Sequence, residues 1–167
     1  LAAEATAWGH RVITTTTTRI LRPGPDESPC VILESDEQLL VAALRDGLRA
    51  HRHVTAARAL HPDGKLLGLL PEVVDGLAGL RLAELIVNEA DGAARLPLKA
   101  PGPFEPVMPS CTRMVVAVVG MDALGATLDP RHAFRPELIS RLTGLAPGDV
   151  ITEEAIAALP GRRITAD

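Results

Sequence analysis

The sequence predicts an α/β fold with a mainly parallel sheet and flanking helices. Short runs of aliphatic and β-branched residues alternate with longer segments whose apolar residues recur at helical spacing. The 167 residues contain no internal repeat and no break in composition, so we expect one domain over residues 1–167. With 47% hydrophobic residues, the chain has enough apolar side chains for a core.

The first half of the chain supplies most of the expected elements. Residues 1–8 form an alanine-rich helix, and Gly9 suits its left-handed end. A strand then begins at Val12 and ends within five consecutive threonines. Ser35 should cap a helix over residues 36–50, whose apolar stripe is made of Leu39, Leu40, Ala43, Leu44 and Leu48. Further strands are expected at residues 31–33, 54–59 and 82–88, and a helix at residues 71–77.

The second half contains fewer regular elements. Residues 90–112 contain five prolines and should form a long ordered loop. The run at residues 114–119 predicts a buried strand, because it is wholly apolar and rich in valine. Helices are expected at residues 136–142 and after Thr152, which suits an N-cap.

Composition excludes several classes of function. The net charge is −4 with no basic cluster along the sequence, and aromatic residues make up 2%, so we expect no nucleic-acid partner. The longest apolar run is too short to cross a bilayer, so we expect no membrane association. Cys30 and Cys111 are far apart and form no metal or redox motif, as in a cytoplasmic chain with two free thiols.

Two acids follow the strand at residues 82–88. Glu89 and Asp91 stand where ligands bind in open α/β sheets, beyond the carboxyl ends of strands, and could hold magnesium or orient a water. Lys99 follows between two prolines and could contact phosphate. An ordinary exposed turn explains the acids and Gly92 about as well from chemistry alone.

The threonine run is the second candidate site. Hydroxyls at a strand end, such as those of Thr16 and Thr17, can bind phosphate oxygens or complete a magnesium shell. Threonine also simply suits strands. A third candidate, residues 120–127, has the glycine spacing of a phosphate loop, but Ala126 replaces the lysine that such a loop requires. We therefore do not interpret it as a phosphate loop. By its position it could line a nucleotide-base or substrate pocket, with Asp122 as an acceptor, or it could be a polar turn after a core strand.

Several motifs together resemble one bacterial family. They are Asn-Glu-Ala-Asp-Gly at residues 88–92, Pro-Leu-Lys-Ala-Pro at 97–101 and Glu-Pro-Val-Met-Pro at 105–109. The threonine strand end, Gly-Lys-x-x-Gly at 64–68, Gly-Met-Asp-Ala-Leu-Gly at 120–125 and His-x-x-Arg-Pro-Glu at 132–137 also fit. This order is similar to the selenium-dependent hydroxylase accessory proteins, also called selenium cofactor biosynthesis proteins.

The resemblance implies an incomplete three-layer fold like that of P-loop NTPases. The Gly-Lys-Thr phosphate loop before the first helix and the terminal segment are missing from the pattern, so we expect a fragment that is itself inactive. The intact protein would bind ATP or GTP with Mg²⁺ and hydrolyse it. Glu89 and Asp91 would position the metal or water. Lys99, Arg19 and Lys65 would contact the ligand, and Asp122 would line a base or substrate pocket.

The expected role is maturation of selenium-dependent molybdenum hydroxylases, with the hydroxylase or a selenium or molybdopterin cofactor intermediate as partner. Two alternatives stay open. One is a non-catalytic module that carries a cofactor intermediate or binds the hydroxylase. The other is a nucleotidyltransferase acting on the molybdopterin cofactor.

Overall fold

The computed structural model describes residues 1–159, which form two compact units. The first unit comprises residues 1–90 and 107–112, and the second comprises residues 91–106 together with those from 113 onward. Each unit has its own hydrophobic core. The expectation of one domain over residues 1–167 stays a prediction.

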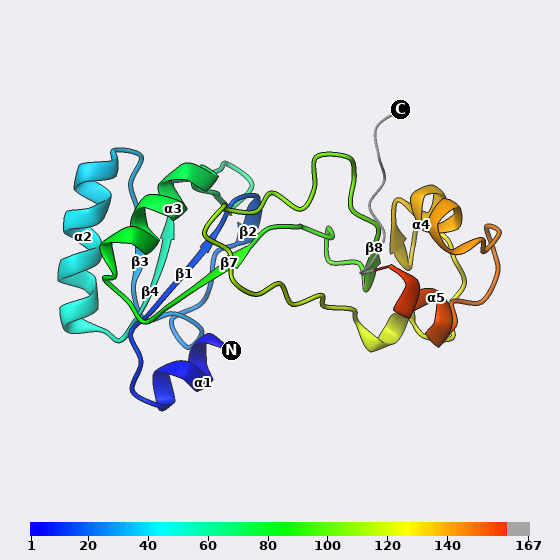
Figure 1. Ribbon diagram of the computed structural model, residues 1–167, viewed down its shortest axis with the longest axis horizontal. Coiled ribbons are helices and arrows are strands. Elements are labelled where there is room, and N and C mark those ends of the chain that lie inside the picture. The colour runs from blue at the N-terminus through cyan, green and yellow to red at the C-terminus, as the bar shows by residue number, and fades with distance from the viewer. Residues whose placement is uncertain (160–167) are drawn as a thin grey trace. The chain divides into compact units, whose positions relative to one another are not determined.

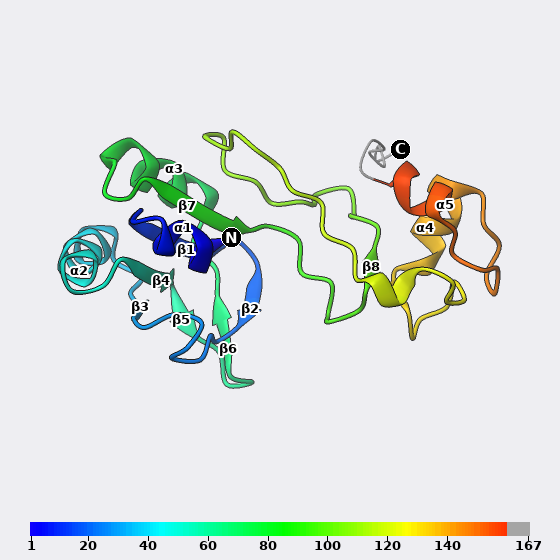
Figure 2. The ribbon, with the colours of Figure 1, turned by 90° about the horizontal axis from the view of Figure 1, so that it is seen from below.

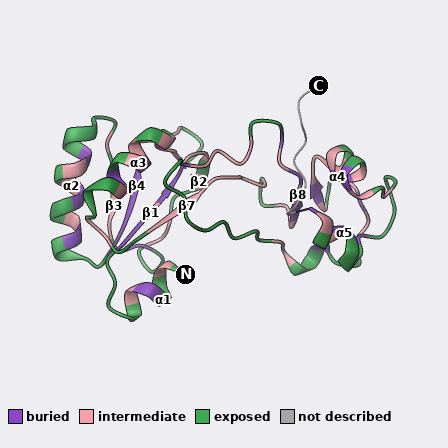
Figure 3. Cartoon of the chain, in the orientation of Figure 1, coloured by how far each residue is buried: buried purple, intermediate pink, exposed green. Residues whose placement is uncertain are grey.

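A parallel sheet of four strands forms the centre of the first unit. Its order is β3 (Val31–Leu33), β4 (His53–Ala57), β1 (Val12–Thr16) and β7 (Leu85–Glu89), and all three neighbouring pairs are parallel (Figure 1). β1 and β4 are the most deeply buried strands, as Figure 3 shows by colour. The predicted α/β class with a mainly parallel sheet is confirmed.

Three helices accompany this sheet: α1 (Ala2–Ala7), α2 (Glu37–Ala50) and α3 (Pro71–Leu80) (Figure 2). Leu40, Leu44 and Leu48 of α2 join Val74 and Leu77 of α3 in one core with side chains from β1 and β4. Ile13 of β1 pairs directly with Val54 of β4, and Ala56 lies two positions further along β4. These core residues therefore share one face of the sheet, and α2 and α3 pack on that face. A three-layer P-loop NTPase-like arrangement stays a prediction.

Two details of α2 differ from the sequence prediction. Asp36, not Ser35, is the N-cap, because its carboxylate accepts hydrogen bonds from the amides of Gln38 and Leu39. Leu39 lies outside the apolar stripe and is exposed. Gly47 lies close to the sheet, since a Cβ there would stand 3.2 Å from Ile32 and 3.3 Å from Val54.

A second, antiparallel sheet completes the first unit. It has the order β2 (Arg19–Leu21), β6 (Lys65–Leu67) and β5 (Ala59–Leu60). The single strand expected at residues 54–59 is therefore divided between β4 and β5, which belong to different sheets. The β5–β6 hairpin closes at the predicted His-Pro-Asp-Gly turn, where the Gly64 amide donates to the His61 carbonyl.

The second unit is built from short elements. β8 (Leu98–Lys99) pairs in parallel with β9 (Ala133–Phe134), and the helices are α4 (Pro136–Thr143) and α5 (Glu153–Ala158). A single 3₁₀ turn, η1, spans Met121–Ala123. The predicted cap of α5 is confirmed, because the Thr152 hydroxyl accepts from the Ala155 amide. Leu98, Leu128, Ile139 and Ile151 lie in its core.

The strand predicted at residues 114–119 is wrong. These residues have no strand assignment, and Met114 and Val118 are 79% and 85% exposed. Their β-forming composition made a strand the natural prediction, but a strand persists only when its backbone groups find a partner. No strand among residues 1–159 pairs with this run.

Candidate functional site

The ends of β1 and β7 bring threonine hydroxyls to a carboxylate. Thr16 pairs with Glu89 in the parallel register, so both stand at the carboxyl edge of the sheet. The Thr16 hydroxyl lies 2.8 Å from Oε2 of Glu89, and the Thr18 hydroxyl donates to the same oxygen. The Thr18 amide donates to the Thr16 hydroxyl at 2.9 Å. The predicted strand-end location of Thr16 and Glu89 is confirmed, and we call this group the threonine edge.

Thr17 and Asn88 extend the threonine edge. The Thr17 hydroxyl donates to the Val107 carbonyl at 2.5 Å, and the Asn88 side-chain amide donates to the Thr17 hydroxyl at 3.3 Å. The other amide atom, Oδ1 of Asn88, is buried and has no hydrogen-bond partner among the described residues. A buried acceptor without a partner is costly, so a donor there, from a water or from a ligand, would be stabilising.

The backbone at Gly68, which follows strand β6 of the antiparallel sheet, forms hydrogen bonds with the threonine edge. Its amide donates to the Thr18 carbonyl at 2.8 Å, and the Leu69 amide donates to the Thr16 carbonyl at the same distance. A Cβ on Gly68 would lie 2.6 Å from the Thr16 carbonyl oxygen and 2.7 Å from the Thr18 carbonyl oxygen. Only glycine permits this close approach, and the Gly-Lys-x-x-Gly pattern already contained that signal.

Arg19 and Lys65 lie on the antiparallel sheet beside the threonine edge. Arg19 of β2 is directly opposite Leu67 of β6. Two positions further along β2, Leu21 is directly opposite Lys65. Side chains alternate along a strand, so the two cations project from the same face of this sheet. Neither forms an ion pair with any other residue of the described chain.

Lys99 and Asp91 belong to an ion network in the second unit. The Lys99 ammonium bonds to Asp91 Oδ1, lies 2.8 Å from Glu105 Oε2, and donates to the Gly92 carbonyl at 2.9 Å. The Lys99 side chain is only 6% exposed. Arg135 also pairs with Glu105, with 2.5 Å between Nη1 and Oε2. This ion network therefore contains two cations and two carboxylates.

The cations of the ion network lie over an aromatic ring, and the network shifts the pKa values of its two carboxyl groups. Both Lys99 and Arg135 lie over the ring of Phe134, at 5.4 and 4.9 Å from its centre. The hydrogen bond from Arg135, with help from Lys99, lowers the pKa of Glu105 to about 2. Burial raises the pKa of Asp91, against the opposing effect of Lys99. A phosphate could reach Lys99 only by displacing a carboxylate.

The predicted site residues thus fall into separate groups. Thr16, Thr17 and Glu89 come together at the threonine edge, while Asp91 and Lys99 are paired in the second unit. Asp122 lies in η1 and is exposed. Within residues 1–159, no three His, Cys, Asp or Glu side chains gather in a way that could hold a metal ion. The sequence did not predict a role in the site for Gly68, Asn88 or Glu105.

The fold and the threonine edge define the class of protein: an α/β protein with hydroxyl and carboxylate groups at the carboxyl edge of a parallel sheet. The family model described as YqeC protein matches residues 1–137, and the chain belongs to that family. No helix in the described part of the chain has the length and apolarity to span a membrane.

One curated relative is the protein named "Uncharacterized protein YqeC" from Escherichia coli (strain K12). It is 33% identical over 159 residues, which cover 95% of this chain and 60% of the relative. The chain therefore spans less than two thirds of that relative's length. No solved structure matches the chain significantly.

Proposed function

We propose that the full-length protein is a nucleotide-binding accessory protein for the maturation of selenium-dependent molybdenum hydroxylases. Its ligand would be ATP or GTP with Mg²⁺, which it would hydrolyse. The motif order that resembles the selenium-dependent hydroxylase accessory proteins supports the biological role, and membership of the YqeC family is consistent with it.

The threonine edge is the observation that carries the nucleotide proposal. Two hydroxyls converge on one carboxylate oxygen at the carboxyl end of adjacent parallel strands, beside a buried amide oxygen that lacks a donor. Ligands of open α/β sheets bind at this end. The threonine hydroxyls would form hydrogen bonds with such a ligand, and the Asn88 amide oxygen would accept one from a donor group on it. Arg19 and Lys65 on the neighbouring sheet would supply positive charge.

The donor atoms of the threonine edge also suit magnesium. Mg²⁺ takes oxygen ligands and is usually held by one or two carboxylates together with substrate phosphates and waters, so it needs no cluster of acids. Glu89 would hold it, with the Thr16 or Thr18 hydroxyl beside it. The ion would neutralise charge on the phosphates. The residues of this chain would bind and orient the nucleotide and a water.

Nucleotide titration tests the biochemical part of the proposal. Calorimetry with MgATP and MgGTP would use a chain as long as the E. coli relative. Glu89→Gln should weaken binding about tenfold and reduce its dependence on Mg²⁺, since charge-assisted contacts contribute roughly 1.5–3 kcal/mol. Glu72→Gln, which alters a carboxylate on α3, is the control. Equal affinity for the wild type and Glu89→Gln would refute the site.

Genetics tests the biological part. Deleting the gene in a host that makes a selenium-dependent molybdenum hydroxylase should remove selenium from the purified hydroxylase while leaving its polypeptide level unchanged. Restoring the wild-type gene should recover the selenium content. Normal selenium content in the deletion strain would overturn the accessory role even if the protein binds nucleotide.

A further inference from the structure

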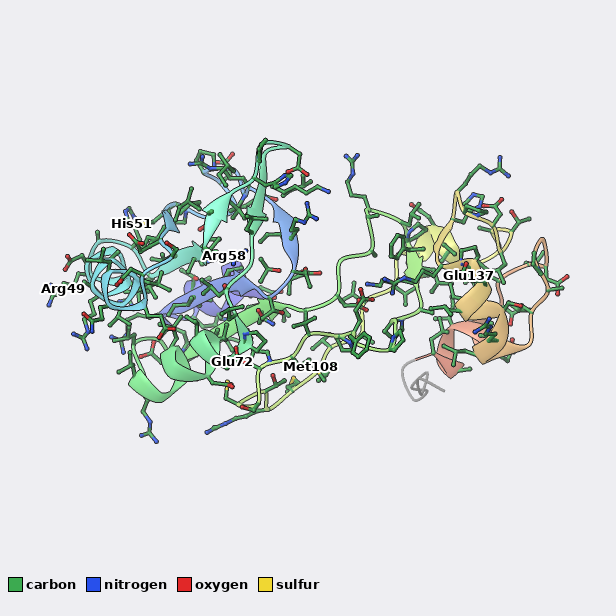
Figure 4. All side chains as sticks on the ribbon, turned by 90° about the horizontal axis from the view of Figure 1, so that it is seen from above. Arg49, His51, Arg58, Glu72, Met108 and Glu137 are labelled. Carbon is green, nitrogen blue, oxygen red and sulfur yellow. The ribbon has the colours of Figure 1, made fainter. Side chains whose placement is uncertain are left out.

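Four arginines gather at the amino edge of the parallel sheet, the edge opposite the threonine edge. Arg11 directly precedes β1 and Arg52 directly precedes β4, while Arg45 and Arg49 lie on the last turns of α2. Figure 4 labels Arg49 near the end of α2, with His51 following it. Arg45, Arg49 and Arg52 are near one another in the sequence, and the fold brings Arg11 to them. We call this group the arginine edge.

The arginine edge surrounds a cavity. A hollow of about 330 Å³ is lined by Arg11, Leu48, Arg49, Ala50, His51 and Arg52. A second hollow of about 150 Å³ shares Arg11, Leu48 and Arg49 with it and adds Arg45 and Leu82. The two hollows are therefore neighbours, with aliphatic side chains and guanidinium groups in their walls. Neither lining includes a carboxylate.

The positive charges of the arginine edge are only partly balanced. Arg11 pairs with Glu84 at 2.6 Å, and Arg49 pairs with Asp46 at 2.8 Å. Arg45 and Arg52 form no ion pair with any residue in the described part of the chain. A surplus of two positive charges, those of Arg45 and Arg52, therefore lines the two hollows.

Stabilisation of a helix end explains only part of this arrangement. Arginines near the last carbonyls of α2 interact favourably with the helix dipole, which accounts for Arg45 and Arg49. Arg11 and Arg52 lie outside the helix, and each is held in place by its own partner. Glu84 accepts from Nε and Nη2 of Arg11, and the Gly9 carbonyl accepts from Nη1 of Arg52 at 2.5 Å. These contacts orient guanidinium groups beside the cavity.

We propose that the arginine edge binds the phosphate group of a small phosphate monoester. Guanidinium groups match the geometry of phosphate and bind it through paired hydrogen bonds. The volume of the larger hollow lies at the low end for small-molecule sites, and Leu48 and Leu82 offer apolar contacts to an organic body. The five residues of β1, at about 3.3 Å each, separate this site from the threonine edge. It is thus a second site, independent of the proposed nucleotide site.

Titration with phenyl phosphate and with inorganic phosphate tests the proposal on the whole chain. The wild type should bind phenyl phosphate with a Kd below about 1 mM, and Arg45→Gln and Arg52→Gln should each raise that Kd about tenfold. Arg22→Gln, which removes an exposed arginine from a loop of the same unit, should leave the Kd unchanged. Arg45 forms no ion pair with a described residue and interacts only with the dipole of α2, so its variant should lower the thermal midpoint by less than about 4 °C.

Three outcomes would overturn the proposal. The first is a wild-type Kd above about 10 mM. The second is an equal Kd in the wild type, Arg45→Gln and Arg52→Gln. The third is tight binding of an acidic peptide such as hexaglutamate without binding of phenyl phosphate, which would assign the arginine edge to a protein partner. Glu89→Gln should leave phenyl phosphate binding intact, so failure of the nucleotide proposal would not affect this result.

Discussion

Replacing Gly68 by alanine should disturb the threonine edge directly. The added Cβ would stand 2.6–2.7 Å from three backbone atoms of residues 16–18. Carbon atoms pack without strain at about 3.5–4.0 Å, so the two backbone segments must separate by most of an ångström. That movement would stretch the 2.8 Å hydrogen bonds from the Gly68 and Leu69 amides to the Thr18 and Thr16 carbonyls.

The expected cost of Gly68→Ala is roughly 1–3 kcal/mol, the usual penalty for overpacking a well-filled site. For a chain of this size, that corresponds to a thermal midpoint lowered by about 2–12 °C. Gly76→Ala is the matched control. Gly76 lies within α3, and a Cβ there would meet no atom within 4 Å. It should stabilise the chain by about 0.5–1 kcal/mol, because alanine favours a helix interior.

Urea and thermal unfolding measure both variants, and amide hydrogen exchange reports on the threonine edge itself. Exchange at the amides of residues 68 and 69 should quicken in Gly68→Ala and stay unchanged in Gly76→Ala. A Gly68→Ala chain within about 0.3 kcal/mol of the wild type, with unchanged exchange at residues 68 and 69, would refute the close contact.

Three further predictions concern the second unit. Glu105→Gln should lower stability in urea unfolding by roughly 1–3 kcal/mol, because Lys99 and Arg135 then share one carboxylate; a loss below about 0.5 kcal/mol would contradict this. The pKa of Glu105 falls from 4.5 to about 2 on folding, so its stabilising effect is complete above pH 4.5 and disappears as the pH falls toward 2. The wild type should therefore lose more stability than Glu105→Gln over that pH range. Asp91→Asn should also lower stability in urea unfolding by roughly 1–3 kcal/mol, because the nearly buried Lys99 then shares Glu105 with Arg135, and a loss below about 0.5 kcal/mol would contradict this.

Local signals in the sequence predicted several regular elements of the first unit, although not the antiparallel strands β2 and β6. The β3 strand at residues 31–33, the end of α2 at Ala50 and the start of α3 at Pro71 coincide with the predicted bounds. Each depends on nearby residues: β-branched side chains, helical periodicity, or a proline in a first helical turn. The placement of the threonine run and of Glu89 at strand ends followed from the same kind of evidence.

Contacts between distant residues could not be predicted in this way. Arg135 is 30 residues from Glu105, and nothing local in the sequence shows that they share an ion pair. The run at residues 114–119 failed for a related reason, because its composition favours a strand but cannot say whether a partner is available. Sequence patterns report local preference, while pairing depends on the rest of the fold.

The charges in each unit also suggest which predicted cations can contact a phosphate. Lys99 is nearly buried, and its ammonium already bonds to Asp91 and Glu105. A phosphate that bound Lys99 would have to break both ion pairs, and the phosphate would also lose its own hydration. Arg19 and Lys65 form no ion pair with a described residue, so a phosphate would displace no carboxylate from them. Both project from one face of the antiparallel sheet, and the hydrogen bonds of Gly68 connect this sheet to the threonine edge. The same ligand would gain charge-assisted hydrogen bonds from them at little cost. Positive charge for a nucleotide at the threonine edge is therefore better supplied by Arg19 and Lys65 than by Lys99.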